Sequence, residues 1–381
     1  MLTAEPDVDG SNPHGARRIP AGSLGRREFL RAIVSSLTLA PLEPILRAIL
    51  GDPVLLAEAA ALSQKTVTVD LHGHASSISS PYFPGVDPNL VENIKAGGLD
   101  AAVLAIRGDY PLIKRETNGH RYEARSAKPG ELLRRGTEQL DKMLDGISKG
   151  KFSLGRSPSD IIEAKKRGVP CILPSLEGCD PLEGDLARIK EFYERGVCVL
   201  QLMHYRINEI GDIQTAPPRH HGLSDFGREV VREMNRLGMV IDTAHSSPDT
   251  LSGVLKTSRT PVIFSHTGIR ALRALSRHLD DTELRAIAAK GGIIGIWPNL
   301  RRRNNFDTFL KDIDYAQKLV GADHVGIGTD VFGLGNHTAI PTHKEFALIP
   351  AALLKRGYSD SVVEKIVGEN FMRLFREVVQ S

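Results

Sequence analysis

Short apolar runs recur along the chain from residue 66 onward, and helix-like segments separate most of them. The runs carry Val, Ile and Leu at successive positions, which is typical of parallel strands covered on both faces. Strands that alternate with helices predict an α/β fold, and eight such runs favour a closed (β/α)8 TIM barrel over an open doubly wound sheet. The predicted strands cover residues 66–72, 100–106, 170–176, 197–203, 239–244, 261–265, 291–297 and 324–329.

Amphipathic segments with recognisable ends predict the helices between these strands. Ser157-Pro158 opens a helix that stops at Gly168, since a capping Ser before Pro is a frequent start and Gly a frequent stop. Ser224 likewise caps a helix that runs to Leu237. Further helices are expected at 131–149 and 281–289, and apolar positions on one face predict a single final helix over 360–379.

The long polar segment 107–156 lies between the second and third predicted strands. Connections of this length inside a barrel are uncommon and are usually functional. We therefore expect an insertion over the barrel mouth that acts as a lid or shapes the substrate pocket.

The N-terminal part differs from the rest of the chain. Residues 1–25 are rich in Gly, Pro and Ala, which predicts disorder. Arg26-Arg27-Glu28-Phe29-Leu30-Arg31 precedes a mild apolar run and predicts a twin-arginine export signal, with a short amphipathic helix as the alternative. The run is far below the ~20 residues of a membrane span.

These features predict the organisation and location of the chain. We expect a disordered leader with the signal at 1–62 and a barrel domain at 63–381. A twin-arginine signal predicts export to the periplasm or another extracytoplasmic site, and an uncleaved leader would add membrane association. The sequence does not specify the oligomeric state, and a homodimer is one assembly that it allows.

Composition narrows the function classes. The net charge is +3 and aromatic residues make up 5% of the chain, so no basic stripe with interleaved aromatics points to nucleic acid. The cysteines number three, an odd count, which argues against a disulfide framework.

Metal-type side chains stand at the ends of the predicted strands, where a barrel builds its active site. His72 and His74 are two apart at the end of the first strand, so both side chains face the same side. Glu177 ends the third strand, and a carboxylate there would be costly to bury without a partner. His245 and His266 end consecutive strands. A carboxylate can bridge two cations, so these residues predict a two-metal site, for which zinc is the best match and manganese, cobalt or iron are alternatives.

Two further strand-end residues suit catalysis. His204 can serve as a ligand or as a hydrogen-bond donor to an oxyanion. Asp330 can accept a proton from water whose pKa a metal lowers, or it can simply cap a loop.

The residues in this order resemble the membrane (renal) dipeptidase family of zinc peptidases. The resemblance spans roughly residues 66–378 and is most specific in LPSLEG, GLSDFGREVVREMNRLGMVIDTAHSS, PVIFSHTGIRAL, HLDDTELRAIAAKGGIIGI, DHVGIGTD and GENFMRLFREV. It implies a barrel of the metal-dependent hydrolase type that hydrolyses dipeptides through a metal-bound hydroxide at a binuclear zinc site.

The resemblance also implies a role for each residue. His72 and His74 would hold one zinc ion, His245 and His266 the other, and Glu177 would bridge them. The substrate would be contacted by His204 at its carbonyl, by Asp330, which handles the proton, and by Arg277, which grips its carboxylate.

Two departures from the family pattern affect substrate and metal choice. His72-Gly73-His74 stands where the family usually has His-x-Asp, which keeps a ligand but removes a negative charge. Val331-Phe332-Gly333 replaces a second acidic residue after Asp330, so Phe332 is expected to reshape the pocket.

Two rival interpretations remain. His-x-His is also typical of amidohydrolase-type barrels, including one-metal deaminases and two-metal lactonases, but no lysine ends the fourth strand to bridge metals there. A non-catalytic binding protein on the same scaffold is disfavoured because Glu177, Asp330 and the later histidines are retained.

Overall fold

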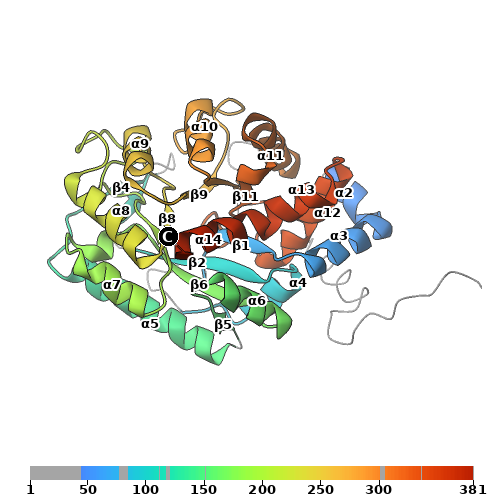
Figure 1. Cartoon of the computed structure of the whole chain (residues 1–381), viewed down its shortest axis with the longest axis horizontal. Helices are drawn as coiled ribbons and strands as arrows, with labels where there is room; N and C mark the ends of the chain where they lie inside the picture. The colour runs from blue at the N-terminus through green and yellow to red at the C-terminus, as the bar shows by residue number, and fades with distance from the viewer. Residues whose placement is uncertain are drawn as a thin grey trace, which may run out of the picture.

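Parallel strands form one continuous sheet at the centre of the fold, in the order β1-β2-β6-β7-β8-β9-β10-β11, and helices surround it (Figure 1). The computed structural model describes residues 44–380 apart from 77–84, 111, 117–120, 151, 301–304 and 336. The strands are β1 (Val69–Gly73), β2 (Ala101–Arg107), β6 (Cys171–Glu177), β7 (Val199–Gln201), β8 (Val240–Asp242), β9 (Ile263–Thr267), β10 (Ile293–Ile296) and β11 (Val325–Ile327).

The sheet closes on itself where β1 meets the segment after β11. The Asp330 amide donates to the His72 carbonyl at 2.8 Å, and the His74 amide donates to the Val331 carbonyl at 3.0 Å. Residues along β2 and β6 are buried on both faces, which explains their unbroken apolar runs. The predicted (β/α)8 barrel is confirmed, and every predicted strand overlaps an observed one.

The helices between the strands follow the predicted end signals. The Ser157 hydroxyl accepts a hydrogen bond from Asp160 N, and the Ser224 hydroxyl accepts one from Gly227 N at 2.9 Å. The outer helices are α4 (Leu90–Ala96), α6 (Pro158–Lys166), α7 (Ala187–Glu194), α8 (Asp225–Leu237), α9 (Pro248–Thr257), α10 (Asp281–Ala289), α11 (Phe306–Val320) and α12 (Leu348–Lys355).

The predicted single helix over 360–379 is wrong, because the structure breaks it at Gly368. It consists of α13 (Asp360–Glu364), a π-helical turn (Lys365–Glu369) and α14 (Asn370–Gln380). Gly368 leaves helical geometry and approaches the barrel so closely that a Cβ atom there would lie 2.0 Å from the Val67 carbonyl oxygen. Tertiary packing therefore overrides the helical periodicity at this position.

Helix α14 covers the end of the barrel opposite the polar strand ends. Its buried Phe371, Leu374 and Phe375 belong to one cluster with the first residues of several strands, among them Val69 of β1 and Ala101 of β2. This apolar cluster fills one end of the barrel. A site can therefore open only at the other end, where the polar strand ends lie.

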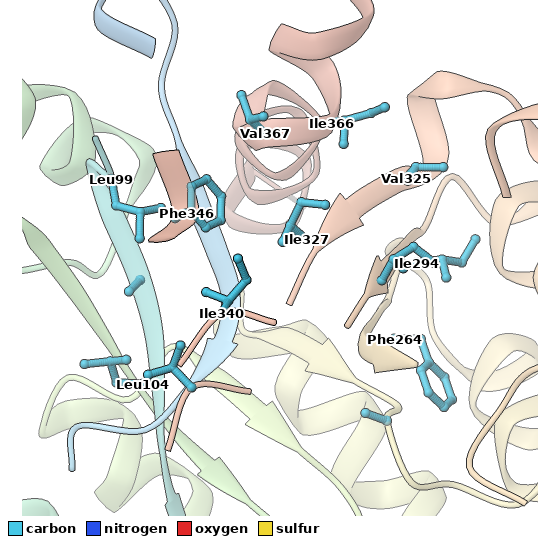
Figure 2. Packing of buried hydrophobic residues seen from close by; sticks show 14 of the residues in the cluster. Leu99, Leu104, Phe264, Ile294, Val325, Ile327, Ile340, Phe346, Ile366 and Val367 are labelled. Carbon is cyan, nitrogen blue, oxygen red and sulfur yellow. The ribbon is translucent and has the colours of Figure 1, made fainter. Parts of the chain in front are cut away.

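A second core lies between the strands and the outer helices. Figure 2 shows part of it, with Val325 and Ile327 of β11 near Ile366 and Val367 of the π-helical turn. Burial on both sides of the strands gives the site a rigid support.

The N-terminal boundary differs from the expected one at residue 63. Helices α2 (Pro44–Leu50) and α3 (Pro53–Lys65) lie beside α12 (Figure 1), and α3 buries Leu55, Leu56, Ala59 and Leu62. The folded part thus includes residues from 44 onward, because this segment has apolar side chains to bury. The Arg26-Arg27 motif lies outside the described residues. Among the described helices, none has the length and apolarity to cross a membrane.

The described parts of the insertion at 107–156 are folded. They comprise a hairpin of β3 (Ile113–Arg115) and β4 (Arg121–Glu123), the helix α5 (Glu131–Lys149) and β5 (Ser153–Leu154), which pairs in parallel with the first two residues of β6. Helix α5 matches the prediction at 131–149, whereas the hairpin was not predicted.

Candidate metal centre

Polar side chains converge at the open mouth of the barrel because successive strands end there. His72 lies in β1, Glu177 ends β6 and His266 lies in β9. The others stand just beyond strand ends: His74 after β1, His204 after β7, His245 after β8 and Asp330 after β11. The structure therefore brings together every residue predicted as a ligand or catalytic group, and all of them are buried.

The Glu177 carboxylate stands at the centre of this cluster, and histidine Nε2 atoms surround it. The distances from Nε2 to the nearer Glu177 oxygen are 3.4 Å for His204, 3.5 Å for His72, 3.5 Å for His245, 3.7 Å for His74 and 3.9 Å for His266.

These separations suit ligands that share a cation rather than groups that hydrogen-bond directly. Atoms placed tetrahedrally at the usual zinc–ligand distances lie roughly 3.3–3.5 Å from one another. Within the described part of the chain, the buried atoms His72 Nδ1, His72 Nε2, Glu177 Oε2 and His245 Nδ1 have no hydrogen-bond partner. Because buried polar atoms are seldom left without one, this donor set fits metal ions.

Among the residues that the structure describes, the potential ligand atoms fall into three overlapping sets, each with all atoms within 4.8 Å of one another: His72, His74 and Asp330; His72, Glu177 and His266; Glu177, His204 and His245. Glu177 Oε1 faces His72, His245 and His266, whereas Oε2 faces His74 and His204. The two oxygens thus point to different groups of imidazoles, as a bridging carboxylate would. His72 shares an oxygen with His245 and His266, a different division from the predicted pairing of His72 with His74 alone.

Burial keeps two of the imidazoles in the neutral form that a metal requires. It lowers the pKa of His245 and of His266 well below the ordinary value, and the nearby Arg277 lowers both further. Their Nε2 atoms are 3.2 Å apart, an arrangement that a shared cation would stabilise. Burial also lowers the pKa of His72, but the Glu177 carboxylate outweighs it and raises that pKa to about 9.

Contacts beneath the cluster fix the orientation of the first-strand ligands. His74 Nδ1 lies 3.0 Å from the Ala105 carbonyl oxygen, so it donates its proton there and leaves the Nε2 lone pair for the site. Asp70 Oδ1 accepts from His72 N at 3.2 Å and from Thr329 N at 2.9 Å. Asp70 thus ties β1 to the segment that carries Asp330.

His204 is held by a buried aspartate that the sequence did not single out. Asp109 Oδ1 lies 2.7 Å from His204 Nδ1, and Asp109 Oδ2 accepts from Tyr205 N at 3.0 Å. Asp109 is 0% exposed. This contact places the His204 proton on Nδ1 and turns Nε2 toward Glu177.

Backbone strain is concentrated at the site. His245 (φ 73°) and Asp330 (φ 51°) occupy the left-handed region, which is costly for residues other than glycine and often marks functional positions. Gly333 is required beside them, since a Cβ there would lie 1.8 Å from Asp330 Oδ1 and 3.0 Å from His74 Nε2.

A pocket opens over the cluster. Its lining consists of His74, Arg121, Glu177, His204, Tyr205, His245, Trp297, Asp330, Gly333 and Leu334. Phe332 is not part of this lining and packs against the core, whereas Leu334 lines the pocket. Arg277 lies beside the lining: its Nη2 donates to His266 Nε2 at 3.1 Å, its Nη1 donates to Gln214, and its guanidinium sits 5.5 Å from the Trp297 ring centroid.

Sequence reasoning missed Asp109, Tyr205 and Arg121. Asp109 and Arg121 belong to the insertion, where no periodic pattern indicates which side chains face the site. Tyr205 had one usable signal, since it directly follows His204 at a strand end.

The comparisons with known proteins agree with this geometry. The family model described as "Membrane dipeptidase (Peptidase family M19)" matches residues 56–381. Dipeptidase tcpJ of Claviceps purpurea is 32% identical over 236 residues, which cover 60% of this chain and 56% of that protein. Dipeptidase verJ of Clonostachys rogersoniana is 32% identical over 257 residues, which cover 65% of this chain and 66% of that protein. The chain thus spans less than two thirds of the length of these relatives. A crystal structure of an amidohydrolase from Pseudomonas aeruginosa has a TM-score of 0.69 and 26% identity, with 85% of this chain and 99% of that chain covered.

Proposed function

The chain belongs to the membrane dipeptidase family (Peptidase family M19), and on this premise we propose that it hydrolyses the peptide bond of dipeptides with two bound zinc ions. The observation that carries the proposal is the position of Glu177, whose two oxygens face different groups of histidines at the open mouth of the barrel. A carboxylate shared in this way is typical of two-metal hydrolases.

The donor set indicates which residues would hold the metal. His72, His74, His245 and His266 offer imidazole nitrogens, and Glu177 offers both of its oxygens. Imidazole and carboxylate ligands suit zinc, which when bound polarises a carbonyl and lowers the pKa of water to about 7.

The remaining residues would act on the substrate. His204, oriented by Asp109, presents Nε2 to the pocket and can donate to the carbonyl oxygen once it is protonated. Asp330 lies 3.4 Å from His74 Nε2 and lines the pocket, where its carboxylate can accept a proton and pass it to the leaving amine. Arg277 would hold the C-terminal carboxylate of the dipeptide, which requires it to release Gln214.

We also propose the location of the enzyme. The Arg26-Arg27 motif supports export by the twin-arginine route to the periplasm or another extracytoplasmic site. A fusion of residues 1–43 to a reporter that fluoresces after folded export should locate outside the cytoplasm, and Arg26→Lys together with Arg27→Lys should retain it inside. Light scattering of the purified chain decides between a monomer and a homodimer.

Metal analysis and a dipeptide panel test the proposed activity together. The purified protein should hold close to two metal ions and hydrolyse simple dipeptides of LL or LD configuration. Asp330→Asn should lower kcat by at least 100-fold while the metal content stays near two. A metal-replete protein that splits no dipeptide would reject the substrate class. A metal count near one with deaminase activity would favour the amidohydrolase alternative.

A further inference from the structure

His343 is a buried histidine that lies outside the cluster of metal-type residues. It begins a short 3₁₀ helix (His343–Ala347) in the segment after β11, and it is 0% exposed. Its Nε2 atom lies 3.2 Å from Asp70 Oδ2. This is close enough for a hydrogen bond, but among the described residues neither ring nitrogen of His343 has an aligned hydrogen-bond partner. Burial of a polar ring is unfavourable unless it is compensated, so packing alone would favour an apolar side chain at this position.

The backbone around His343 is fixed on two sides. The Thr342 hydroxyl accepts a hydrogen bond from Lys344 N at 3.3 Å, and the Glu345 carboxylate accepts one from Thr342 N at 3.0 Å. Gly97 follows α4, and a Cβ atom there would lie 1.9 Å from the His343 carbonyl oxygen. The main chain of His343 therefore packs directly against the end of α4, and its ring extends to the polar residues of β1.

The His343 ring also lies next to the backbone between the two first-strand ligands. Gly73 separates His72 from His74 and has no side chain. A Cβ atom at Gly73 would lie 3.2 Å from His343 Nε2 and 3.4 Å from Asp70 Oδ2. The absence of a side chain at this position therefore leaves the space that the imidazole needs to reach Asp70.

Asp70 connects this imidazole to the site. Its Oδ1 accepts from His72 N at 3.2 Å and from Thr329 N at 2.9 Å, and its Oδ2 accepts from the Thr329 hydroxyl at 2.5 Å. His343 Nε2 thus shares Oδ2 with Thr329, the residue before Asp330. Contacts that restrain this carboxylate restrain both of the chain segments that it joins, and both segments carry candidate ligands.

We propose that His343 is a positioning residue for the metal centre: its Nε2 restrains the Asp70 carboxylate, which in turn fixes the backbone of His72 and of the segment that carries Asp330. This inference rests on the proposed two-zinc function, because it assigns His343 to the ion that His72, His74 and Asp330 would bind. Loss of a contact that orients a ligand typically lowers metal affinity about 10- to 100-fold.

The test measures zinc affinity by competition with a chelator. His343→Phe keeps a buried ring but removes both nitrogens, whereas His343→Gln keeps an N–H group within reach of Asp70. His343→Phe should weaken the binding of one zinc ion by about 10- to 100-fold and should leave the other within about threefold of wild type. His343→Gln should stay within about threefold for both ions. Thermal unfolding of the metal-free proteins should be nearly equal, and the zinc concentration that half-activates dipeptide hydrolysis should rise only in His343→Phe.

Gly73→Ala perturbs the same contact from the other side. The added Cβ would crowd His343 Nε2 and displace the ring from Asp70. It should weaken the same zinc ion by about 10-fold in the wild-type background. In the His343→Ala background it should cost less than about threefold, because the smaller side chain leaves room for the added methyl group.

His324→Gln provides the matched control. His324 also belongs to a 3₁₀ helix beside β11 (Ala322–His324), but it lies at the start of the strand, where its Nδ1 is 2.9 Å from the Gly292 carbonyl oxygen. Its replacement should leave both zinc affinities within about twofold of wild type, since it contacts none of the metal-type residues.

Two results would overturn the inference. One is unchanged zinc affinity in both His343→Phe and Gly73→Ala. The other is an equal loss in His343→Phe and His343→Gln together with earlier thermal unfolding of the metal-free proteins, which would show that the ring only fills space. Either result leaves the proposed function intact, whereas a wild-type protein that binds no zinc would reject the function on which the inference rests.

Discussion

Asp109→Asn tests how strongly one buried carboxylate supports catalysis through His204. In the wild-type protein Asp109 Oδ1 lies 2.7 Å from His204 Nδ1, and Oδ2 accepts from Tyr205 N at 3.0 Å. In the variant, the amide oxygen can satisfy only one of these donors. If it serves Tyr205 N, the new NH2 group faces His204 Nδ1, and the imidazole must move its proton to Nε2.

The size of the effect follows from the charge that is lost. Opposite charges about 4 Å apart at an effective dielectric constant of ~20 attract by about 4 kcal/mol. A neutral amide contact would retain about 1 kcal/mol. If an imidazolium at His204 stabilises the oxyanion, the barrier should rise by up to about 3 kcal/mol, which lowers kcat by roughly 100-fold. KM should change less than threefold, because the ground-state substrate carries no such charge.

A double-mutant cycle separates this role from a structural one. kcat and KM are measured for wild type, Asp109→Asn, His204→Gln and the double variant, with metal content and thermal unfolding checked in each. If Asp109 acts through His204, Asp109→Asn should cost less than threefold in the His204→Gln background. The same 100-fold cost in both backgrounds, or a kcat within threefold of wild type in the single variant, would refute the reasoning.

Three further predictions concern neighbouring positions. Gly333→Ala should lower kcat/KM at least about 100-fold with little change in thermal stability, because the added Cβ would displace the Asp330 carboxylate; unchanged activity would show that the loop yields freely. His74→Asp should shift metal content after dialysis from zinc toward manganese, since a carboxylate is the harder ligand, and an unchanged ratio would contradict this. Burial and Arg273 lower the pKa of His278 to about 4. As the pH falls, the folded protein therefore binds this proton only at a lower pH than the unfolded chain does. The free energy of unfolding should therefore fall by on the order of 3 kcal/mol between pH 6.5 and pH 4. His278→Gln should remove that slope in denaturant titrations, and an identical slope would exclude His278.

The barrel could be predicted from the sequence because parallel strands that are covered on both faces are apolar at nearly every position. The apolar runs that became β2 and β6 needed no tertiary information, and the capping serines fixed the starts of α6 and α8. The break at Gly368 was not predictable, since it depends on the approach of the Val67 carbonyl from a segment far away in sequence. The two helices before β1 were also missed, because apolar residues in a leader and in a docked helix look alike until their partner α12 is placed.

The metal-type residues of the site were predictable because each stands at the end of an apolar run. The residues that contact and orient these side chains could not be predicted from the sequence. Asp109 and Arg121 come from the insertion, where contacts with His204 and Tyr205 are made across the barrel mouth and leave no periodic pattern. The division of the histidines between the two Glu177 oxygens likewise depends on three-dimensional positions, which spacing along single strands does not determine.

The seam where the barrel closes explains why backbone strain and candidate catalytic groups occur together. Asp330 adopts φ 51° while its amide donates to the His72 carbonyl at 2.8 Å, so the bond that closes the sheet also sets the direction of the carboxylate. Asp70 joins the same two segments through Thr329, with 2.5 Å between Asp70 Oδ2 and Thr329 Oγ1. At the opposite end, α14 buries apolar side chains against the first residues of several strands. The closed ring therefore maintains an unfavourable backbone conformation at the mouth, and the stability that supports it comes from the other end of the barrel.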